Sequence, residues 1–183
     1  IAYWVSDQLF NCFDSTLLED VYETKKGMFT GNNNYFLKLW YEIECKKLGN
    51  DFRFYNKGGG FRRWYGHNDI IIRWHNNGKE VKEYKGSGNV NDKFFYDSCL
   101  SWNLVSTAPF CCRVVEEGNV MGDAGPICLI NKSDVNYNYL LGYLNSNTFN
   151  KFIAILNPTM NYPPGIVGKV PLIIDKIKKE ELI

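Results

Sequence analysis

Short apolar runs rich in aromatic and β-branched residues alternate with turn-forming residues through the middle of the chain. The runs cover residues 36–43, 52–55, 61–65, 70–74, 81–84, 99–105, 110–115 and 127–130. Runs of this length and composition, bounded by turn signals, predict strands. Asn77-Gly78 predicts a hairpin, and Glu117-Gly118-Asn119 predicts another turn. We therefore expect the region between about residues 35 and 130 to be mainly β.

Helical spacing of apolar residues marks both ends of the chain. It predicts a helix over residues 1–13 and two short helices over 136–144 and 148–156, the second capped by Thr148. A Gly- and Asn-rich loop is expected at residues 27–34, and a Pro- and Gly-rich extended crossing at 158–171. Residues 175–181 look like the start of a further helix. The predicted fold class is α+β, mainly β, with short helices at the N-terminus and in the C-terminal third.

Length and composition indicate a globular protein. A chain of 183 residues fits one domain, and 45% hydrophobic with 22% charged residues is close to the average of soluble domains. The chain contains no run of about 20 apolar residues, the length that a membrane span needs. We expect one soluble domain over residues 1–183 that does not enter a membrane.

Six cysteines are present, but none forms a Cys-x-x-Cys pair, and the two histidines lie eight residues apart with no cysteine between them. A chain of this size does not need disulfides, so we expect reduced thiols packed as small hydrophobes and a cytoplasmic protein. A structural zinc site is not expected, because the usual ligand spacing is missing.

Motifs for chemistry are also missing from the sequence. Lys57-Gly58-Gly59-Gly60 lacks the second half of a phosphate-binding P-loop, and neither histidine accompanies a nucleophile motif. Glu80-x-Lys82 is too weak a match to a nuclease centre to carry an assignment. No catalytic residue and no metal ligand is predicted within this chain.

Charge is unevenly distributed along the chain. Residues 45–93 contain eleven Lys or Arg and five acidic residues, which gives +6, whereas the remainder of the chain is −5. A basic segment within a nearly neutral chain is typical of a partner with regular negative charge, most commonly nucleic acid. A merely solvated basic face remains an equal alternative from charge alone.

The block from Tyr55 to Asn68 combines the groups that a DNA backbone requires. Three consecutive glycines permit close approach, Lys and Arg neutralise phosphates, and aromatic rings supply rigid flat surface. The residues assigned to this role are Lys57, Gly58, Gly59, Gly60, Arg62, Arg63, Trp64 and Tyr65. Contacts to base edges are assigned to Asn68, Arg73, Asn32, Asn33 and Asn34.

Each assignment has a structural alternative. Strand alternation would place the ring of Trp64 or Tyr65 in the core. His67 fits a surface turn, and residues 32–34 fit a turn whose side chains satisfy their own backbone. Arg113 lies in an apolar run and fits a residue at the edge of the core with a carboxylate partner, the alternative being a DNA contact.

Four blocks carry a family resemblance across nearly the whole chain. They are residues 1–6 (IAYWVS), 30–36 (TGNNNYF), 55–66 (YNKGGGFRRWYG) and 157–162 (NPTMNY). Together they resemble the C-terminal region of adenine-specific DNA methyltransferases of the BREX phage-defence type. The chain is also similar to fused restriction-modification enzymes with a TaqI-like specificity domain.

The resemblance implies a target-recognition domain. It would bind double-stranded DNA beside a catalytic domain of the same polypeptide, upstream of Ile1, that uses S-adenosylmethionine. Asn161-Tyr162-Pro163-Pro164 has the letters of the catalytic turn in the wrong order, so no cofactor is expected in this chain itself. The third glycine of the block stands where such proteins usually carry an acidic residue, and the target sequence is therefore not transferred.

Two further hypotheses remain open. The first is a protein-interaction domain that docks other subunits of the defence system, for which the sequence indicates an exposed apolar patch over residues 162–167. The second is an independent enzyme such as a nuclease, which would require a carboxylate cluster that the sequence does not show.

Overall fold

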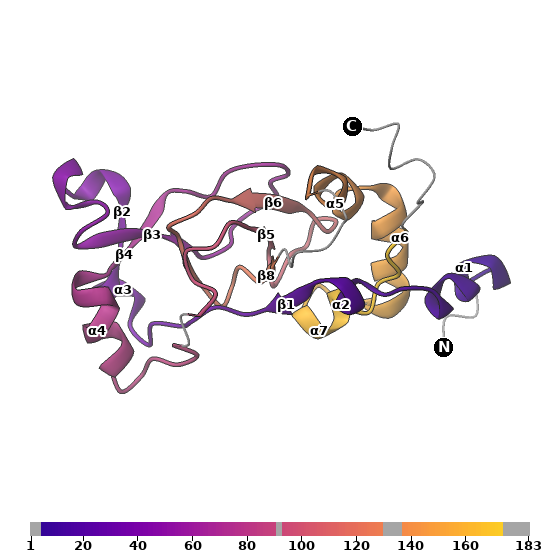
Figure 1. Cartoon of the computed structure of the whole chain (residues 1–183), viewed down its shortest axis with the longest axis horizontal. Coiled ribbons are helices and arrows are strands. Elements are labelled where there is room, and N and C mark those ends of the chain that lie inside the picture. Colours follow the sequence, from indigo (N-terminus) through magenta and orange to yellow (C-terminus); the bar gives the residue numbers. More distant parts are fainter. Residues whose placement is uncertain (1–4, 91–92, 130–136, 174–183) are drawn as a thin grey trace.

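The computed structural model describes residues 5–90, 93–129 and 137–173. Two four-stranded sheets and a group of helices make up the molecule. The first sheet lies at the centre, the second sheet lies toward one end with α3 and α4, and α5, α6 and α7 lie toward the other (Figure 1). The α+β class with mainly sheet character that the sequence predicts is confirmed.

The first sheet is entirely antiparallel. Its order is β1 (Glu23–Lys25), β8 (Ile127–Leu129), β5 (Cys99–Trp102) and β6 (Cys112–Val115). In the register of β5, Cys99 pairs with Val115 on one side and with Leu129 on the other. The outer strand β6 has only β5 as a neighbour in this order, so its other edge is open to further pairing.

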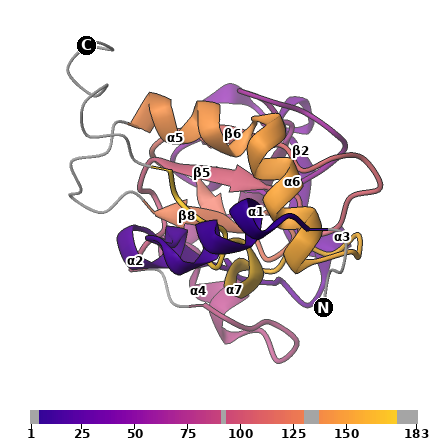
Figure 2. The same cartoon turned by 90° about the vertical axis from the view of Figure 1, so that its right-hand side faces the viewer.

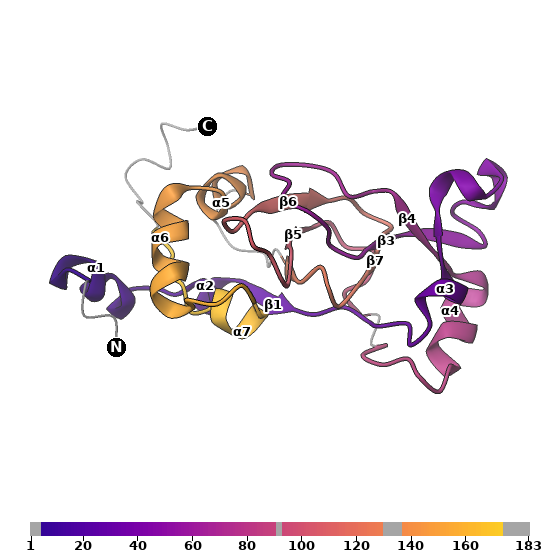
Figure 3. The same ribbon diagram turned by 180° about the vertical axis from the view of Figure 1, so that it is seen from behind.

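The second sheet combines local and distant segments. Its order is β2 (Leu37–Leu39), β4 (Ile70–Arg73), β3 (Phe52–Asn56) and β7 (Val120–Met121). The first three strands pair antiparallel, whereas β7 pairs parallel to β3, with Tyr55 opposite Val120. Figure 3 shows β7 beside β3 from behind. Because β7 follows the first sheet's β6 in the chain, this pairing ties the two sheets together.

Both faces of the first sheet are covered, and the whole of β5 is buried. Leu100 and Trp102 belong to the core shared with the helices, whereas Cys99 belongs to the core shared with the second sheet. Successive strand residues point to opposite faces, so one strand supplies both cores. The polar alternation of a half-exposed strand is therefore absent from β5.

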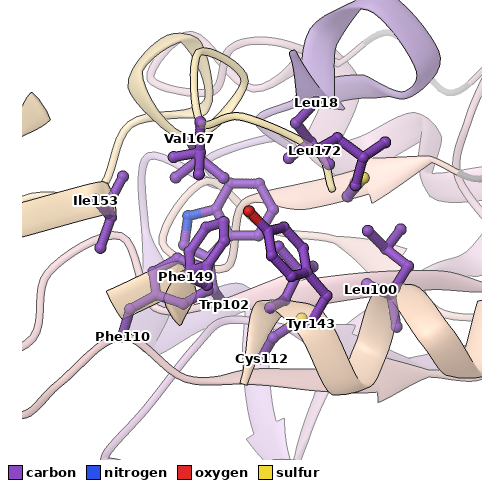
Figure 4. Close-up of a cluster of buried hydrophobic side chains, with 14 of the residues drawn as sticks. Leu18, Leu100, Trp102, Phe110, Cys112, Tyr143, Phe149, Ile153, Val167 and Leu172 are labelled. Carbon is purple, nitrogen blue, oxygen red and sulfur yellow. The ribbon is translucent and has the colours of Figure 1, made fainter. Parts of the chain in front are cut away.

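The helices form the cover on one face of the first sheet. They are α2 (Leu18–Val21), α5 (Tyr137–Leu144), α6 (Asn147–Leu156) and α7 (Pro164–Val167), and this end of the molecule faces the viewer in Figure 2. Phe149 of α6 packs 4.7 Å from the ring of Phe110 and 5.6 Å from that of Tyr143, measured between ring centroids (Figure 4). These contacts fix α6 against the sheet.

Short helices complete the chain. They are α1 (Asp7–Asn11), η1 (Cys12–Asp14), α3 (Asn33–Phe36), η2 (Trp40–Glu42), η3 (Cys45–Lys47) and α4 (His75–Glu83). Of the described part of the helix expected over residues 1–13, only 7–11 form an α-helix, followed by the 3-10 turn η1, while Ser6 is its extended N-cap. The helices α5 and α6 confirm the C-terminal pair. The cap of α6 is Ser146, which accepts from the N–H of Phe149, and the prediction of Thr148 is wrong. The crossing 158–171 contains α7, and the tail 175–181 lies outside the described residues.

Five strand predictions are wrong or too long by more than one residue, the fifth being residues 81–84 discussed below. Of residues 36–43, only 37–39 form a strand, because Glu42 accepts from the N–H of Leu39 and closes η2. Residues 61–65 form an irregular loop that makes one bridge, at Trp64. Of the other runs, 99–105 shortens to β5 and 110–115 to β6, and residue 130 lies outside the described part.

The hairpin expected at Asn77-Gly78 is replaced by a helix entry. Asn76, Asn77 and Gly78 all have left-handed φ angles, between 48° and 72°. Gly78 lies against the ring of Trp74, where an added Cβ would come within 2.7 Å of a ring carbon. The chain then continues as a helix that buries Val81, so the strand predicted at 81–84 is wrong. Asn and Gly favour left-handed geometry in either kind of turn.

All six cysteines are free thiols, and four of them are buried: Cys99, Cys111, Cys112 and Cys128. The prediction of thiols packed as small hydrophobes holds for these four. Among the described residues, no helix combines the length and the apolar character needed to cross a membrane.

Phe149→Ala tests the core between the helices and the first sheet. Because Phe149 is fully buried, its loss leaves a cavity and is expected to lower the free energy of unfolding by about 3–5 kcal/mol. Met160→Ala is the control, since Met160 is 56% exposed, and a change within about 0.5 kcal/mol is expected. Urea denaturation measures both. Equal losses in the two variants would contradict this assignment of the core.

Candidate nucleic-acid interface

Residues 57–69 join β3 to β4 and lie along the outer edge of β6. The N–H of Trp64 donates to the carbonyl of Cys112 (3.0 Å), and the N–H of Val114 donates to the carbonyl of Trp64 (2.9 Å). We call this segment the edge loop; it passes beside β6 in Figures 1 and 3. The two hydrogen bonds cover an edge of the first sheet that would otherwise be unpaired.

Asn103 holds the glycine-rich start of the edge loop. Its side-chain oxygen accepts from the N–H of Gly59 (3.1 Å), and its amide nitrogen donates to the carbonyl of Gly60 (2.9 Å). Nε2 of His67 lies 2.8 Å from the same carbonyl and must be the protonated nitrogen, because a carbonyl only accepts. Two side chains from different parts of the chain therefore fix the backbone at Gly60.

Close packing explains two of the three glycines. A Cβ at Gly59 would come within 2.5–2.9 Å of the His67 ring, so a side chain there would displace the imidazole. Gly58 has φ of +83°, and a Cβ there would lie 2.4 Å from the carbonyl oxygen of Ala124. Gly60 is exposed, and a Cβ there would meet nothing within 4 Å. The loop is thus tightly held at residues 58 and 59 and open at residue 60.

Arg113 lies beneath the edge loop and is fully buried. Its two terminal nitrogens donate to Oδ1 of Asn103 (3.0 Å) and Oδ1 of Asn56 (3.3 Å). Asn56 in turn donates to Ser101 and to the carbonyl of Gly125. The partners of Arg113 are therefore amides, and the expectation of a carboxylate partner is wrong.

Aromatic side chains point outward from the edge loop. Phe61, Trp64 and Tyr65 are 50%, 52% and 55% exposed, which corrects the expectation that Trp64 or Tyr65 places its ring in the core. Trp64 has φ of +73°, so the alternation of an extended strand does not apply. The loop presents rigid rings to solvent on a backbone that is held from beneath.

Cationic side chains lie among these rings. Arg62 is exposed, whereas Lys57 and Arg63 are half-buried. The guanidinium of Arg63 lies 5.4 Å from the centre of the Phe61 ring, and its Nε is buried without an acceptor. The predicted DNA-contacting residues 57–60 and 62–65 therefore lie together on one loop.

The predicted base-contacting residues are not all on this surface. Asn68 lies near the end of the edge loop and lines a narrow recess with His67 and Asn119. Arg73 pairs with Phe52 at the start of β3, while the edge loop leaves from the end of that strand, at Asn56. Four residues of β4 span roughly 10 Å, so Arg73 lies at the opposite end of the second sheet.

Residues 32–34 also lie at that opposite end, since α3 leads directly into β2. Asn32 accepts from the N–H of Tyr35 and caps α3, and Asn33 accepts from the hydroxyl of Thr30. The alternative that these side chains satisfy their own turn therefore holds for Asn32 and Asn33, while Asn34 is exposed. Arg73 stacks its guanidinium 4.8 Å from the Tyr35 ring.

Further exposed aromatics were missed by the sequence analysis. Trp40 and Tyr41 are 49% and 64% exposed, and the N–H of Trp40 donates to the carbonyl of Asp69, where the edge loop ends. Phe61 is not among the residues that the sequence predicts to contact DNA, although it lies between Gly60 and Arg62 of the same block. A short 3-10 helix replaces the expected strand at residues 40–42, and this turns the two rings outward.

The fold and the edge loop define a small α+β module with an exposed surface that is both basic and aromatic. Over the residues that the structure describes, no group of three or more His, Cys, Asp and Glu side chains could hold a metal ion. No protein-family model matches the chain.

Known relatives of the chain are adenine-specific methyltransferases. It is 30% identical to the adenine-specific methyltransferase PglX of Lacticaseibacillus casei (strain Zhang), over 94% of the chain and 16% of that protein. It is 30% identical to the adenine-specific methyltransferase BrxX of Escherichia coli O9:H4 (strain HS), over 94% of the chain and 15% of that protein. The chain is thus homologous to part of the BREX-type adenine-specific methyltransferases, which confirms the resemblance, and it spans about one sixth of the length of these relatives.

Gly58→Ala tests the packing of the edge loop. The substitution forces a left-handed residue against the carbonyl of Ala124, and we expect it to cost about 1–3 kcal/mol of unfolding free energy. Gly60→Ala is the matched control in the same loop, because its Cβ meets open space. It is expected to change stability by less than about 0.5 kcal/mol. A Gly60→Ala variant as unstable as Gly58→Ala would refute this loop geometry.

His67 makes stability depend on pH. Burial lowers the pKa of His67 below its ordinary value; the hydrogen bond that its ring donates to the carbonyl of Gly60 opposes this, and the charges of Arg113 and Arg62 reinforce it. Below about pH 6.5, His67 is therefore protonated more readily in the unfolded chain than in the folded chain. The free energy of unfolding falls as the pH decreases. We expect less of this loss between about pH 7.5 and 5.5 in His67→Asn, whose side chain tolerates the left-handed φ. Denaturant unfolding at both pH values measures it, and identical losses in the two proteins would exclude His67.

Proposed function

We propose that the chain is the DNA-recognition part of an adenine-specific DNA methyltransferase. In this proposal the edge loop binds double-stranded DNA and positions it for a separate catalytic domain of the same polypeptide, which uses S-adenosylmethionine. The similarity to the two methyltransferases supports an association with methyltransferase activity. Phage defence and a cytoplasmic location belong to the same proposal.

The observation that carries the proposal is the construction of the edge loop. Its backbone is fixed by β6, Asn103 and His67, and its exposed residues between Phe61 and Tyr65 are aromatic or cationic. Exposed large rings cost solvation free energy unless a partner covers them. A preorganised basic loop lowers the entropy lost when a phosphate backbone binds.

Each group has a specific part in this proposal. Arg62 and Lys57 would pair with phosphates, and the open face at Gly60 would admit the sugar-phosphate chain. Trp64 and Tyr65 would pack on sugars or bases at the groove edge. Asn68 is the candidate for a base contact from the same loop.

The other residues predicted to contact bases do not lie on the edge loop. Arg73 and residues 32–34 lie at the far end of the second sheet, so they are not part of the surface that the edge loop forms. The hydrogen bonds of Asn32 and Asn33 within their own turn favour a structural role.

A protein-docking function is the second candidate. The apolar patch expected at residues 162–167 is not exposed as a patch: Val167 is fully buried, and Tyr162 and Ile166 pack against the core under the helices. The exposed rings of the edge loop are the surface that still favours this candidate, because aromatic residues are also enriched at protein interfaces.

DNA binding by the chain tests the proposed function. We expect Lys57→Ala/Arg62→Ala to weaken binding to a DNA duplex about tenfold or more at low salt and to reduce the slope of log affinity against log salt by about two. Fluorescence anisotropy over a salt series measures both quantities. Arg63 is left intact because its guanidinium packs on Phe61.

The matched control is Lys151→Ala/Lys169→Ala, which removes the same charge from exposed residues in the helical part of the chain. It should leave affinity within about twofold. Equal effects of the two pairs would show that binding does not involve the edge loop. No binding by the unchanged chain at about 20 mM salt would instead favour the protein-docking candidate.

A further inference from the structure

Arg113 is a buried cation without a counter-charge. It is fully buried, yet no carboxylate forms an ion pair with it in the described ranges 5–90, 93–129 and 137–173. Its hydrogen-bond acceptors are the neutral amides of Asn56 and Asn103, and its Nε has no acceptor. Arginine stays protonated in proteins, and a buried charge is ordinarily paired. The charge of Arg113 is therefore uncompensated by the groups that contact it.

Neighbouring groups do not neutralise this charge. Arg62 repels Arg113, and both cations act on His67. The buried thiols nearby are not thiolates, because burial raises the pKa of Cys99 and of Cys112 above the ordinary thiol value. The positive charge lies in a medium of low dielectric constant, which screens its field less than water does.

The place where this field can act is the glycine-rich start of the edge loop. Asn103 donates to the carbonyl of Gly60 and, through the same side chain, accepts from Arg113. One amide therefore separates the guanidinium from an exposed backbone. Gly60 carries no side chain and faces open space, so an anion can approach there closely.

We propose that Arg113 is an affinity determinant for DNA: its unpaired charge attracts the phosphate that docks at Gly59 and Gly60, and that phosphate supplies the missing counter-charge. Arg113 does not touch DNA in this arrangement and acts through space from beneath the loop. The inference rests on the proposed function, since it concerns the same surface. It adds a buried residue of the outer strand β6 to a site otherwise made of exposed or half-buried residues.

Asn103→Asp tests this role, because it places a carboxylate 3.0 Å from the Arg113 guanidinium without changing side-chain size. The retained Oδ1 still accepts from the N–H of Gly59, whereas the oxygen that replaces Nδ2 no longer donates to the carbonyl of Gly60. That carbonyl keeps its hydrogen bond from His67, and the new ion pair with Arg113 offsets the lost bond. We expect duplex-DNA affinity to fall roughly three- to tenfold at low salt while the midpoint of thermal unfolding stays the same or rises. A merely structural role of Asn103 would not weaken binding and preserve stability together.

Asn147→Asp is the matched control, because it adds the same charge at an exposed position at the start of α6. It should leave DNA affinity unchanged. Unchanged affinity in Asn103→Asp, at undiminished stability, would overturn the inference while leaving the proposed function intact. Absence of DNA binding by the unchanged chain would overturn both.

A second pair keeps the inference testable if Asn103→Asp is unstable. Arg113→Lys retains the charge and loses the forked hydrogen bonds, whereas Arg113→Met removes the charge at similar size. We expect Arg113→Lys to bind DNA at least threefold more tightly than Arg113→Met under the same low-salt conditions. Equal affinities of the two variants would overturn a through-space role of the charge.

Discussion

Arg113, Asn56 and Asn103 form a polar contact in the interior on which the arrangement of both sheets depends. Arg113 comes from β6 of the first sheet, and Asn56 is the last residue of β3 in the second. Buried polar groups that lose a partner cost more than they contribute when paired, so this network tolerates one relative placement of the sheets. The end of β3, where the edge loop begins, is positioned by that requirement.

The same network explains why an exposed loop has a defined shape. Exposed connections ordinarily have few fixed contacts and higher mobility than the elements they join. Here Asn103 and Arg113 reach the loop from the interior, and Trp64 adds two backbone hydrogen bonds to β6. A binding surface gains from such anchoring, because less conformational entropy remains to be lost on association.

Periodicity alone predicts the elements whose side chains face a core. The strands β3, β4, β5, β6 and β8 and the helices α5 and α6 lie where apolar spacing indicates them. Two of the failures lie where left-handed residues interrupt the predicted strands, at Trp64 in the edge loop and at Asn76 and Asn77 before α4. An apolar run reveals burial, but the backbone direction at such residues depends on contacts such as Trp74 on Gly78, which lie outside any periodic pattern.

Part of the candidate site is predictable from the sequence, and part of it is not. Residues 57–65 are adjacent in sequence, so composition alone groups their charges and rings. Their support from Asn103 and Arg113 depends on strand pairing across more than forty residues, which a single sequence does not reveal. Arg73 is likewise separated from the edge loop by the length of β4. The loop enters this strand at Ile70, and Arg73 is the last residue of the strand.

The residues that hold the edge loop in place are different from the residues that it exposes to solvent. Phe61, Arg62, Trp64 and Tyr65 contribute little buried area, so their replacement costs the fold little. Gly58, Gly59 and Asn103 are constrained by contacts within 3.1 Å or by a left-handed backbone and leave no such freedom. A loop built in this way can present different exposed side chains on an unchanged support, which is the property that a recognition domain needs in order to read different sequences with one fold.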